Sequence, residues 1–219
     1  MGNEGSKAGP SQPIDVINSL RKNTPFTVLE TDQIIRRYNA MDPSPQGKTG
    51  ITVDECIMMP EFTGCVFGPD IIQYYKDSTT KKIHPRQFMK ICTMLCRRTP
   101  ALKKKEFLFD LYDVDKQKVL THDALFRLYK LMFHGAVSDD HILALVYSAL
   151  RHPNLSKDGE VTRDEFSDMI PDVEIQERLS VDFAFDRSFQ PDVPEKEEDE
   201  EDDDEDDDDG DDEEAESKK

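Results

Sequence analysis

Residues 154–165, with the sequence NLSKDGEVTRDE, place oxygen-bearing side chains at the spacing of a calcium-binding loop. Gly stands at the sixth of the twelve positions, where the chain turns sharply, and Glu stands at the twelfth, where both of its oxygens can bind a cation. Because only two of the predicted side-chain ligands are carboxylates, we expect at most one weakly bound calcium ion. The predicted ligands are the side chains of Asn154, Ser156, Asp158 and Glu165 and the main-chain carbonyl of Glu160.

Three other segments have the outline of the same loop but have lost ligands. The loop 113–124 begins with Asp-Val-Asp, yet Lys118 replaces the sixth-position Gly and Ala124 replaces the twelfth-position Glu. The loop 76–87 carries lysines at its first and sixth positions, and two ammonium groups repel a divalent cation. The loop 42–55 is 14 residues long and contains two prolines, which breaks the ligand register. We therefore expect no ion in these three loops.

Segments with helical periodicity flank each loop. Apolar residues recur at helical spacing in residues 107–112 and 125–133, so this stretch predicts helix, loop, helix. Thr27 and Glu30 form the sequence pattern of a capping box that begins an earlier helix. The segment 97–105, RRTPALKKK, is a basic link between the second and third units, and residues 173–185 are a last amphipathic piece.

An apolar residue stands at the same loop position in all four units, where paired EF-hand loops form a short β-bridge. We predict an all-α EF-hand fold of four helix–loop–helix units in two paired lobes, residues 25–98 and 99–185, with mostly degenerate loops. Retention of the bridging residue where ligands are lost indicates that pairing matters more than calcium. The predicted bridges join Ile51 to Ile83 and Leu120 to Val161.

The N-terminal segment, residues 1–24, begins MGNEGS, which matches the pattern for myristoylation of Gly2 with Ser at the sixth position. A chance match at a disordered tip is the alternative interpretation. One myristoyl chain gives only marginal binding to a bilayer, so a second attachment is needed. With no secretory signal and no apolar run of about 18 residues, we expect a cytoplasmic protein at the membrane periphery. The four cysteines are expected to be reduced core residues.

The chain ends in an acidic tail, residues 186–219, that we expect to be disordered. Residues 195–219 contain 19 acidic and 3 basic residues, so their net charge of −16 accounts for most of the −19 of the whole chain. The remainder is close to neutral, which argues against binding nucleic acid. One hypothesis is that the tail binds basic proteins, as an acidic chaperone does.

Three stretches of the sequence resemble the calcineurin B family, and most closely the calcineurin B homologous proteins, which are subunits of sodium/proton exchangers. Together with Met1-Gly2 and four units in order, the resemblance extends to about residue 183. The stretches are ITVDECIMMPEF at 51–62, FDLYDVDK at 109–116 and EIQERLSVD at 174–182.

The resemblance implies a non-catalytic regulatory subunit that binds an amphipathic helix of a larger target, either an ion exchanger or a phosphatase catalytic subunit. The ligand losses predict that this binding is largely independent of calcium, and a weak calcium sensor is the alternative. No nucleophile, base and orienting acid can be assembled from the pattern, so no enzyme is expected. Methionines suit a target groove because the thioether adapts its shape, although each is also a normal core residue. The candidates are Met58, Met59, Met89, Met94, Met132 and Met169.

Overall fold

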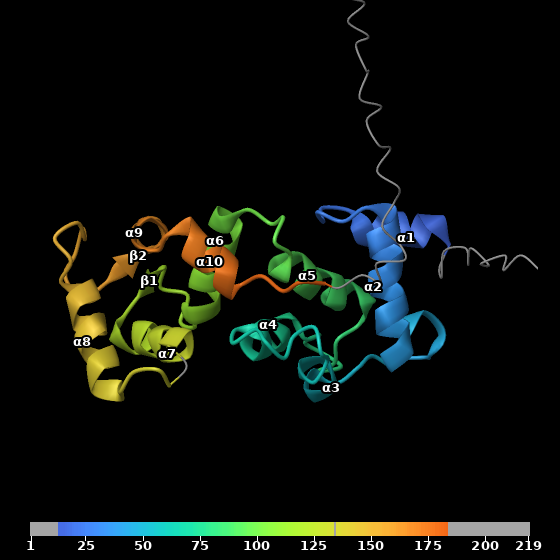
Figure 1. Cartoon of the computed structure of the whole chain (residues 1–219), viewed down its shortest axis with the longest axis horizontal. Helices are drawn as coiled ribbons and strands as arrows, with labels where there is room; N and C mark the ends of the chain where they lie inside the picture. Colours follow the sequence, from blue (N-terminus) through green and yellow to red (C-terminus); the bar gives the residue numbers. More distant parts are fainter. Residues whose placement is uncertain (1–12, 134, 184–219) are drawn as a thin grey trace, which may run out of the picture. The chain divides into compact units, whose positions relative to one another are not determined.

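The computed structural model describes residues 13–133 and 135–183 of the 219-residue chain, and this part is built of helices joined by short loops (Figure 1). The predicted Gly2 site and the acidic tail lie outside the described residues. The elements in chain order are α1 Ile14–Arg21, α2 Val28–Met41, the 3₁₀ turn η1 Pro45–Gly47, α3 Val53–Ile57, α4 Gly68–Tyr75, α5 Pro85–Leu95, α6 Ala101–Tyr112, β1 Val119–Leu120, α7 His122–Phe133, α8 Asp139–Leu150, β2 Val161–Thr162, α9 Arg163–Met169 and α10 Asp172–Arg178.

Capping boxes begin three of these helices. In α2 the Thr27 side chain accepts from the Glu30 amide while the Glu30 carboxylate accepts from the Thr27 amide, as predicted. The same reciprocal pair begins α3 and α9. In those two helices the capping Glu is the last residue of a loop, namely Glu55 and Glu165. The residue at the calcium-ligand position therefore also fixes the start of the exit helix.

The loops pair at the two predicted positions. Ile51 and Ile83 form an antiparallel bridge in which each amide donates to the other residue's carbonyl, at 3.0 and 2.8 Å. Strands β1 and β2 form the second bridge, antiparallel, with Leu120 opposite Val161. All four bridging side chains are buried. The predicted all-α EF-hand fold is confirmed, whereas the boundaries predicted for its two lobes stay a prediction.

One continuous hydrophobic core runs through the described residues and includes side chains from both loop pairs. Phe109 of α6 meets Phe166 of α9 at 5.8 Å between ring centroids, and Tyr38 of α2 meets Phe88 of α5 at 5.4 Å. The four cysteines are free thiols buried in this core, as predicted.

The interpretation of residues 97–105 as a basic link is wrong for its second half. Helix α6 begins at Ala101, and Lys104 and Lys105 are both buried. The Lys104 ammonium donates to three oxygens: Gln176 Oε1 at 3.0 Å, the Leu179 carbonyl at 2.9 Å and Ser180 Oγ at 2.8 Å. Within this run of lysines, Lys104 therefore links α6 by hydrogen bonds to residues near the end of the described chain.

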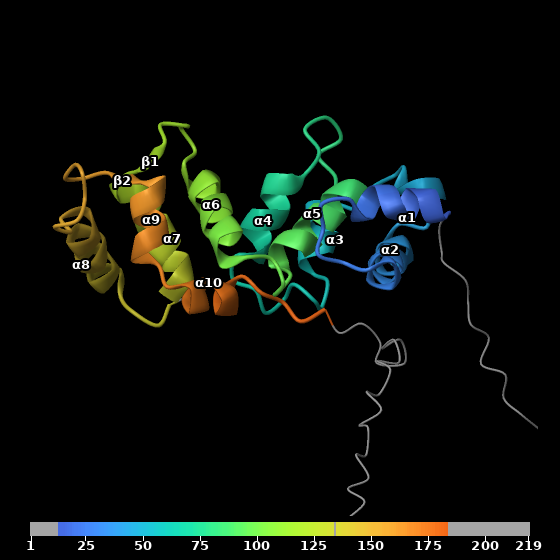
Figure 2. The same ribbon diagram turned by 90° about the horizontal axis from the view of Figure 1, so that it is seen from above.

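The chain after α10 crosses to the first loop pair, a course that Figures 1 and 2 both show. The Val181 amide donates to the Leu95 carbonyl at 2.9 Å, and Val181 forms a parallel bridge with Cys96. Phe183 meets the edges of the Phe26 and Phe62 rings. Among the described residues of the predicted amphipathic piece 173–185, helix α10 ends at Arg178, Leu179 lies in a turn, and Val181 forms the bridge to Cys96.

Candidate functional site

The loop 154–165 is closed by its own glutamate, in the sense that the Glu165 carboxylate accepts hydrogen bonds from other residues of the same loop. Glu165 Oε1 accepts the Ser156 amide at 2.6 Å, and Glu165 Oε2 accepts the Thr162 amide at 2.8 Å and the Thr162 hydroxyl at 2.7 Å. These hydrogen bonds, that from the Thr162 amide first, lower the pKa of Glu165 to about 2. Both carboxylate oxygens of the predicted bidentate ligand are thus engaged by donors of the loop itself.

The other predicted ligands of this loop lie at its surface. Asn154, Ser156 and Asp158 are exposed, and the Glu160 carboxylate pairs with Lys157 at 2.7 Å. Among the described residues, no group of three or more His, Cys, Asp and Glu side chains is arranged to hold a metal ion. The donor set has oxygen chemistry suited to Ca²⁺, but an ion must first displace the Ser156 amide from Glu165. Calcium binding here stays a prediction.

The loop 113–124 is shaped by Asp113. Its Oδ1 accepts the Gln117 amide and its Oδ2 accepts the Lys118 amide, each at 2.9 Å. Lys118 stands at the sixth position with φ of +64°, a conformation that normally favours Gly. A hollow of about 520 Å³ opens inside the loop next to Ala124, the residue that replaces the ligand Glu. This loop therefore keeps the turn of a calcium loop while lacking its last ligand.

Carboxylates close the first two loops in the same manner. Asp42 accepts the amides of Ser44 at 3.1 Å and Gly50 at 2.8 Å, together with the Tyr38 hydroxyl. Burial raises the pKa of Asp42, but these hydrogen bonds outweigh it and the net shift is downward. Asp77 accepts the amides of Thr79 and Thr80. All four loops thus contain a carboxylate that accepts hydrogen bonds from main-chain amides. These hydrogen bonds form without an ion.

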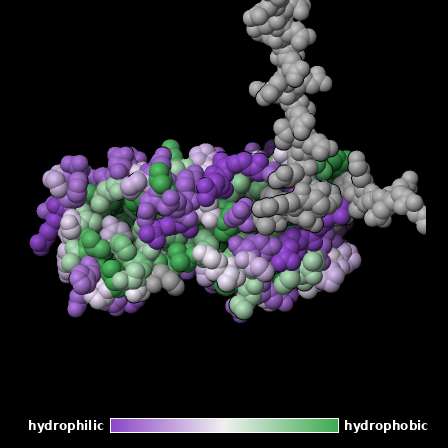
Figure 3. Space-filling model, in the orientation of Figure 1, coloured by the Kyte–Doolittle hydropathy of each residue, from purple (hydrophilic) through white to green (hydrophobic). Residues whose placement is uncertain are grey.

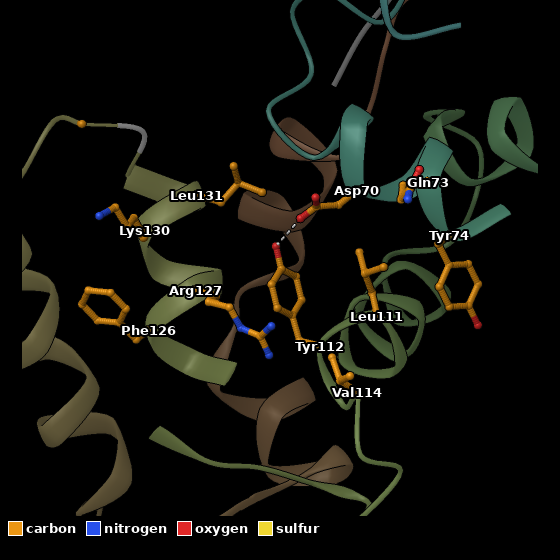
Figure 4. Close-up of a pocket in the computed structure, with 11 residues that line it drawn as sticks. Asp70, Gln73, Tyr74, Leu111, Tyr112, Val114, Phe126, Arg127, Lys130 and Leu131 are labelled. Atoms are coloured by element: carbon orange, nitrogen blue, oxygen red, sulfur yellow. Dashed lines mark hydrogen bonds between the residues drawn. The ribbon is translucent and has the colours of Figure 1, made fainter. Parts of the chain in front are cut away.

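A cleft of about 790 Å³ opens between α4, α6 and α7, away from the ligand positions of the loops (Figure 4). Its apolar surface comes from Tyr74, Leu111, Val114, Phe126 and Leu131. Of these, Val114 is 63% exposed and Tyr74 is 45% exposed. Figure 3 shows apolar residues at the surface between α7 and α4. We call this cleft the α4–α7 groove.

Polar side chains stand on opposite walls of the α4–α7 groove. Helix α4 contributes Asp70 and Gln73, and α7 contributes Arg127 and Lys130. The Tyr112 hydroxyl, from α6, donates to Asp70 Oδ2 at 3.0 Å, so α4 and α6 are joined by two residues that line the groove. The arrangement can bind an apolar helix face and offer charges of opposite sign to its two flanks.

Helix periodicity explains why these side chains face outward. In α4, Ile71 and Ile72 are fully buried and Asp70, Gln73 and Tyr74 take the remaining face. In α7, Leu125 and Leu128 are buried, which leaves Phe126, Arg127, Lys130 and Leu131 on the groove side. The sequence signal for the groove was therefore the presence of two apolar residues, Phe126 and Leu131, outside the buried face of α7.

The six candidate methionines do not line the α4–α7 groove. Met59 and Met89 are core residues at 2% exposure, and the three others with partial burial, Met94, Met132 and Met169, pack against the core. Met58, at 78% exposure, joins Met59 in a separate shallow depression of about 380 Å³. The α4–α7 groove is lined by side chains other than these methionines, and a target-binding role for the six stays a prediction.

The fold and the closed loops define an EF-hand protein of the paired-loop class with an apolar groove. No family model matches the chain. It is similar to the type 1 calcineurin B protein of Dictyostelium discoideum, with 26% identity over 185 residues that cover 84% of this chain and 99% of the relative. The calcineurin B protein of Naegleria gruberi is 21% identical over 83% of this chain and 99% of its own length.

The human type 2 calcineurin B protein is 23% identical over 68% of this chain and 87% of the relative. All three relatives are named as subunits of calcineurin. These similarities support a calcineurin B-like EF-hand protein, whereas the particular closeness to calcineurin B homologous proteins stays a prediction. In the part of the chain that the structure describes, every helix is too short or too polar to cross a bilayer.

Proposed function

We propose that this protein is a non-catalytic regulatory subunit that holds an amphipathic helix of a larger protein in the α4–α7 groove, largely independently of calcium. The observation that carries the proposal is an apolar groove on a scaffold whose loops are closed by their own carboxylates. The relatives are named as subunits, and a subunit needs a surface for its partner. Helix-in-groove docking is the recognition mode that such an apolar surface fits.

The relatives favour a phosphatase catalytic subunit as the target, because all of those quoted above are calcineurin B proteins. The exchanger target rests on the likeness of the sequence to calcineurin B homologous proteins. Both targets offer the same chemistry, an amphipathic helix, and differ in its sequence. Binding of basic proteins by the acidic tail is a separate hypothesis that does not involve the groove.

Independence from calcium follows from how the loops are closed. A ligand shifts a conformational equilibrium only by the difference between its affinities for the two states. In the loop 76–87 an ion meets Lys76 and Lys81, and in the loop 113–124 it finds Ala124 where a carboxylate is needed. In the loop 154–165 it competes with the Ser156 amide for Glu165. The free energy available from ion binding to open the groove is therefore small.

The test is titration of the full-length protein with two helical peptides, one from a calcineurin catalytic subunit and one from a sodium/proton exchanger. The peptide affinity should change by less than about tenfold, roughly 1.4 kcal/mol, between chelator and millimolar calcium. A hundredfold gain with calcium would restore the weak-sensor alternative. Removal of residues 195–219 should leave the affinity nearly unchanged.

A matched pair of variants locates the binding surface. Val114→Asp places a charge on an exposed apolar residue of the groove, whereas Leu145→Asp does so on α8, at an exposed residue that does not line the groove. Neither side chain is in the core, so both variants should fold. We expect Val114→Asp to weaken peptide binding at least tenfold and Leu145→Asp to change it less than twofold. Equal effects would place the site elsewhere.

We also propose that Gly2 is myristoylated and that the lipid gives weak attachment to a membrane surface. Its support is the sequence pattern alone. Co-expression with an N-myristoyltransferase should add the mass of one lipid to the intact protein, and Gly2→Ala should abolish the addition. An unmodified N-terminus in that experiment would remove the basis for the proposed membrane attachment.

A further inference from the structure

Arg127 places a cation at the wall of an otherwise mostly apolar groove. Figure 4 shows its side chain extending from α7 toward Tyr112, between the apolar side chains Val114 and Phe126. Within the described part of the chain, no carboxylate oxygen lies within ion-pair distance of its guanidinium. The side chain is exposed and available to a ligand.

The carboxylates that line the groove or the neighbouring loop hollow with Arg127 either make other contacts or face solvent. Asp70 accepts the Tyr112 hydroxyl on the opposite wall, and Asp123, one turn earlier in α7, faces His122 Nδ1 at 3.0 Å. Asp113, which lines the neighbouring loop hollow with Asp115, accepts two main-chain amides. Asp115 is exposed to solvent on the loop.

The second cation of the same wall differs from Arg127 in this respect. Lys130 pairs with Asp139 at 2.9 Å and stands over the Phe126 ring at 5.8 Å from its centroid. Its charge is already compensated at the rim of the groove. Arg127 lies one turn earlier on the same helix and presents five N–H donors in a planar fork.

A helix that fills the groove removes water from Arg127. Loss of water from a charged group is costly unless an opposite charge and hydrogen-bond acceptors replace it. A carboxylate is the group that meets both needs, because it can accept two parallel N–H bonds from one guanidinium. Beside the wall formed by α4, a carboxylate of the bound helix is disfavoured, because the charge of Asp70 repels it.

We infer that the helix held in the α4–α7 groove carries an Asp or Glu at the edge of its apolar face, and that this carboxylate pairs with Arg127. The inference rests on the proposed function, because it specifies the partner of the same groove. The pairing also fixes the orientation of the bound helix about its own axis. Its acidic edge lies along α7, and its edge along α4 is basic or neutral. The partner is thus recognised by a local charge, although the protein as a whole carries −19.

The probe is a set of synthetic amphipathic peptides that share one apolar face of leucines. Each carries a single Glu at one edge of that face, at one of several positions, and has a matched peptide with Lys at that position. Fluorescence anisotropy with the full-length protein gives the affinities. We expect at least one Glu peptide to bind about tenfold or more tightly than its Lys partner, with a difference that shrinks at high salt.

The protein variants test whether Arg127 is the cause. Arg127→Glu should reverse the preference of that peptide pair, whereas Arg151→Glu, an exposed arginine at the end of α8 outside the groove, should leave it unchanged. Circular dichroism and thermal unfolding check that both variants keep the fold. Preference that survives Arg127→Glu would overturn the assignment to this residue.

The outcomes separate this inference from the proposed function. If Glu and Lys peptides bind equally well and Val114→Asp weakens both, the groove holds a helix but Arg127 does not select an acid, and the inference fails alone. If no peptide of the set binds and the two natural-target peptides also fail, groove docking itself is overturned, and the inference fails with it.

Discussion

Tyr112 and Asp70 are joined by a hydrogen bond of 3.0 Å from the phenolic oxygen to Oδ2, across the boundary between the second and third helix–loop–helix units. Tyr112 is the last residue of α6 and Asp70 lies in the first turn of α4. Burial, followed by the negative charge of Asp70, raises the pKa of Tyr112, so the phenol stays protonated and donates at neutral pH. The bond fixes two walls of the α4–α7 groove relative to each other.

Tyr112→Phe removes this donor and keeps the ring. Because Asp70 is exposed and can be rehydrated, we expect a loss of only about 1 kcal/mol in the free energy of unfolding, measured by urea denaturation. Tyr74→Phe is the matched control in the same groove, since none of the described residues accepts a hydrogen bond from the Tyr74 hydroxyl. Equal losses in the two variants would contradict a structural role for the Tyr112–Asp70 bond.

Lys118 occupies a left-handed conformation, with φ of +64°, in a loop where an EF-hand has Gly. The left-handed region costs a residue with a Cβ about 1–2 kcal/mol, and Gly loses about 0.5–1 kcal/mol through its greater freedom in the unfolded chain. Lys118→Gly should therefore be more stable than Lys118→Ala by about 0.5–1 kcal/mol in urea denaturation. The Ala variant keeps the strain and should stay close to the wild type. A less stable Gly variant would show that the loop is not strained.

Ala124→Glu, combined with Lys118→Gly, should create a calcium site in the third loop. The hollow beside Ala124 has room for the longer side chain, and Asp113, Asp115 and Gln117 already stand at ligand positions. We expect one additional ion per chain in calorimetric titration, with Kd on the order of 10⁻⁵ to 10⁻⁴ M. Ala124→Gln has nearly the same shape without the charge and should bind far more weakly. No added binding with Glu would mean that more than the twelfth ligand has been lost.

Lys104 should make the stability depend on pH in the alkaline range. Burial lowers the pKa of Lys104 from 10.5 to about 8. Between these values the unfolded chain holds more protons than the folded one, so the free energy of unfolding rises with pH across the window from about 8 to 10.5.

The comparison is with Lys104→Met, which fills similar space but cannot donate to the Leu179 carbonyl, Gln176 or Ser180. At neutral pH we expect this variant to be less stable by about 1–3 kcal/mol, because the carbonyl loses its donor. The difference between wild type and variant should then grow by as much as about 3 kcal/mol from pH 8 to 10.5. The other titrating groups are common to both proteins and cancel. A constant difference would show that the ammonium is not destabilised by burial.

The repeat and its loops could be predicted from the sequence alone. Position in a 12-residue loop is a local property, so Ile51, Ile83, Leu120 and Val161 could be matched as bridge partners without knowing how the helices pack. The capping box at Thr27 is local in the same sense, because its two partners are three residues apart. The loss of the twelfth-position ligand at Ala124 can be predicted from the sequence for the same reason.

The groove and the burial of lysines in the run 103–105 depend on how the helices pack, which the sequence does not show. Asp70 and Arg127 face one cleft because the core brings α4 and α7 together. The sequence of either helix alone does not predict this cleft. Lys103 is exposed and Lys104 is buried, although the two are identical neighbours, because the Lys104 side chain points at the Leu179 carbonyl. Burial depends on which distant segment covers a helix face, and that is set by packing among the helices.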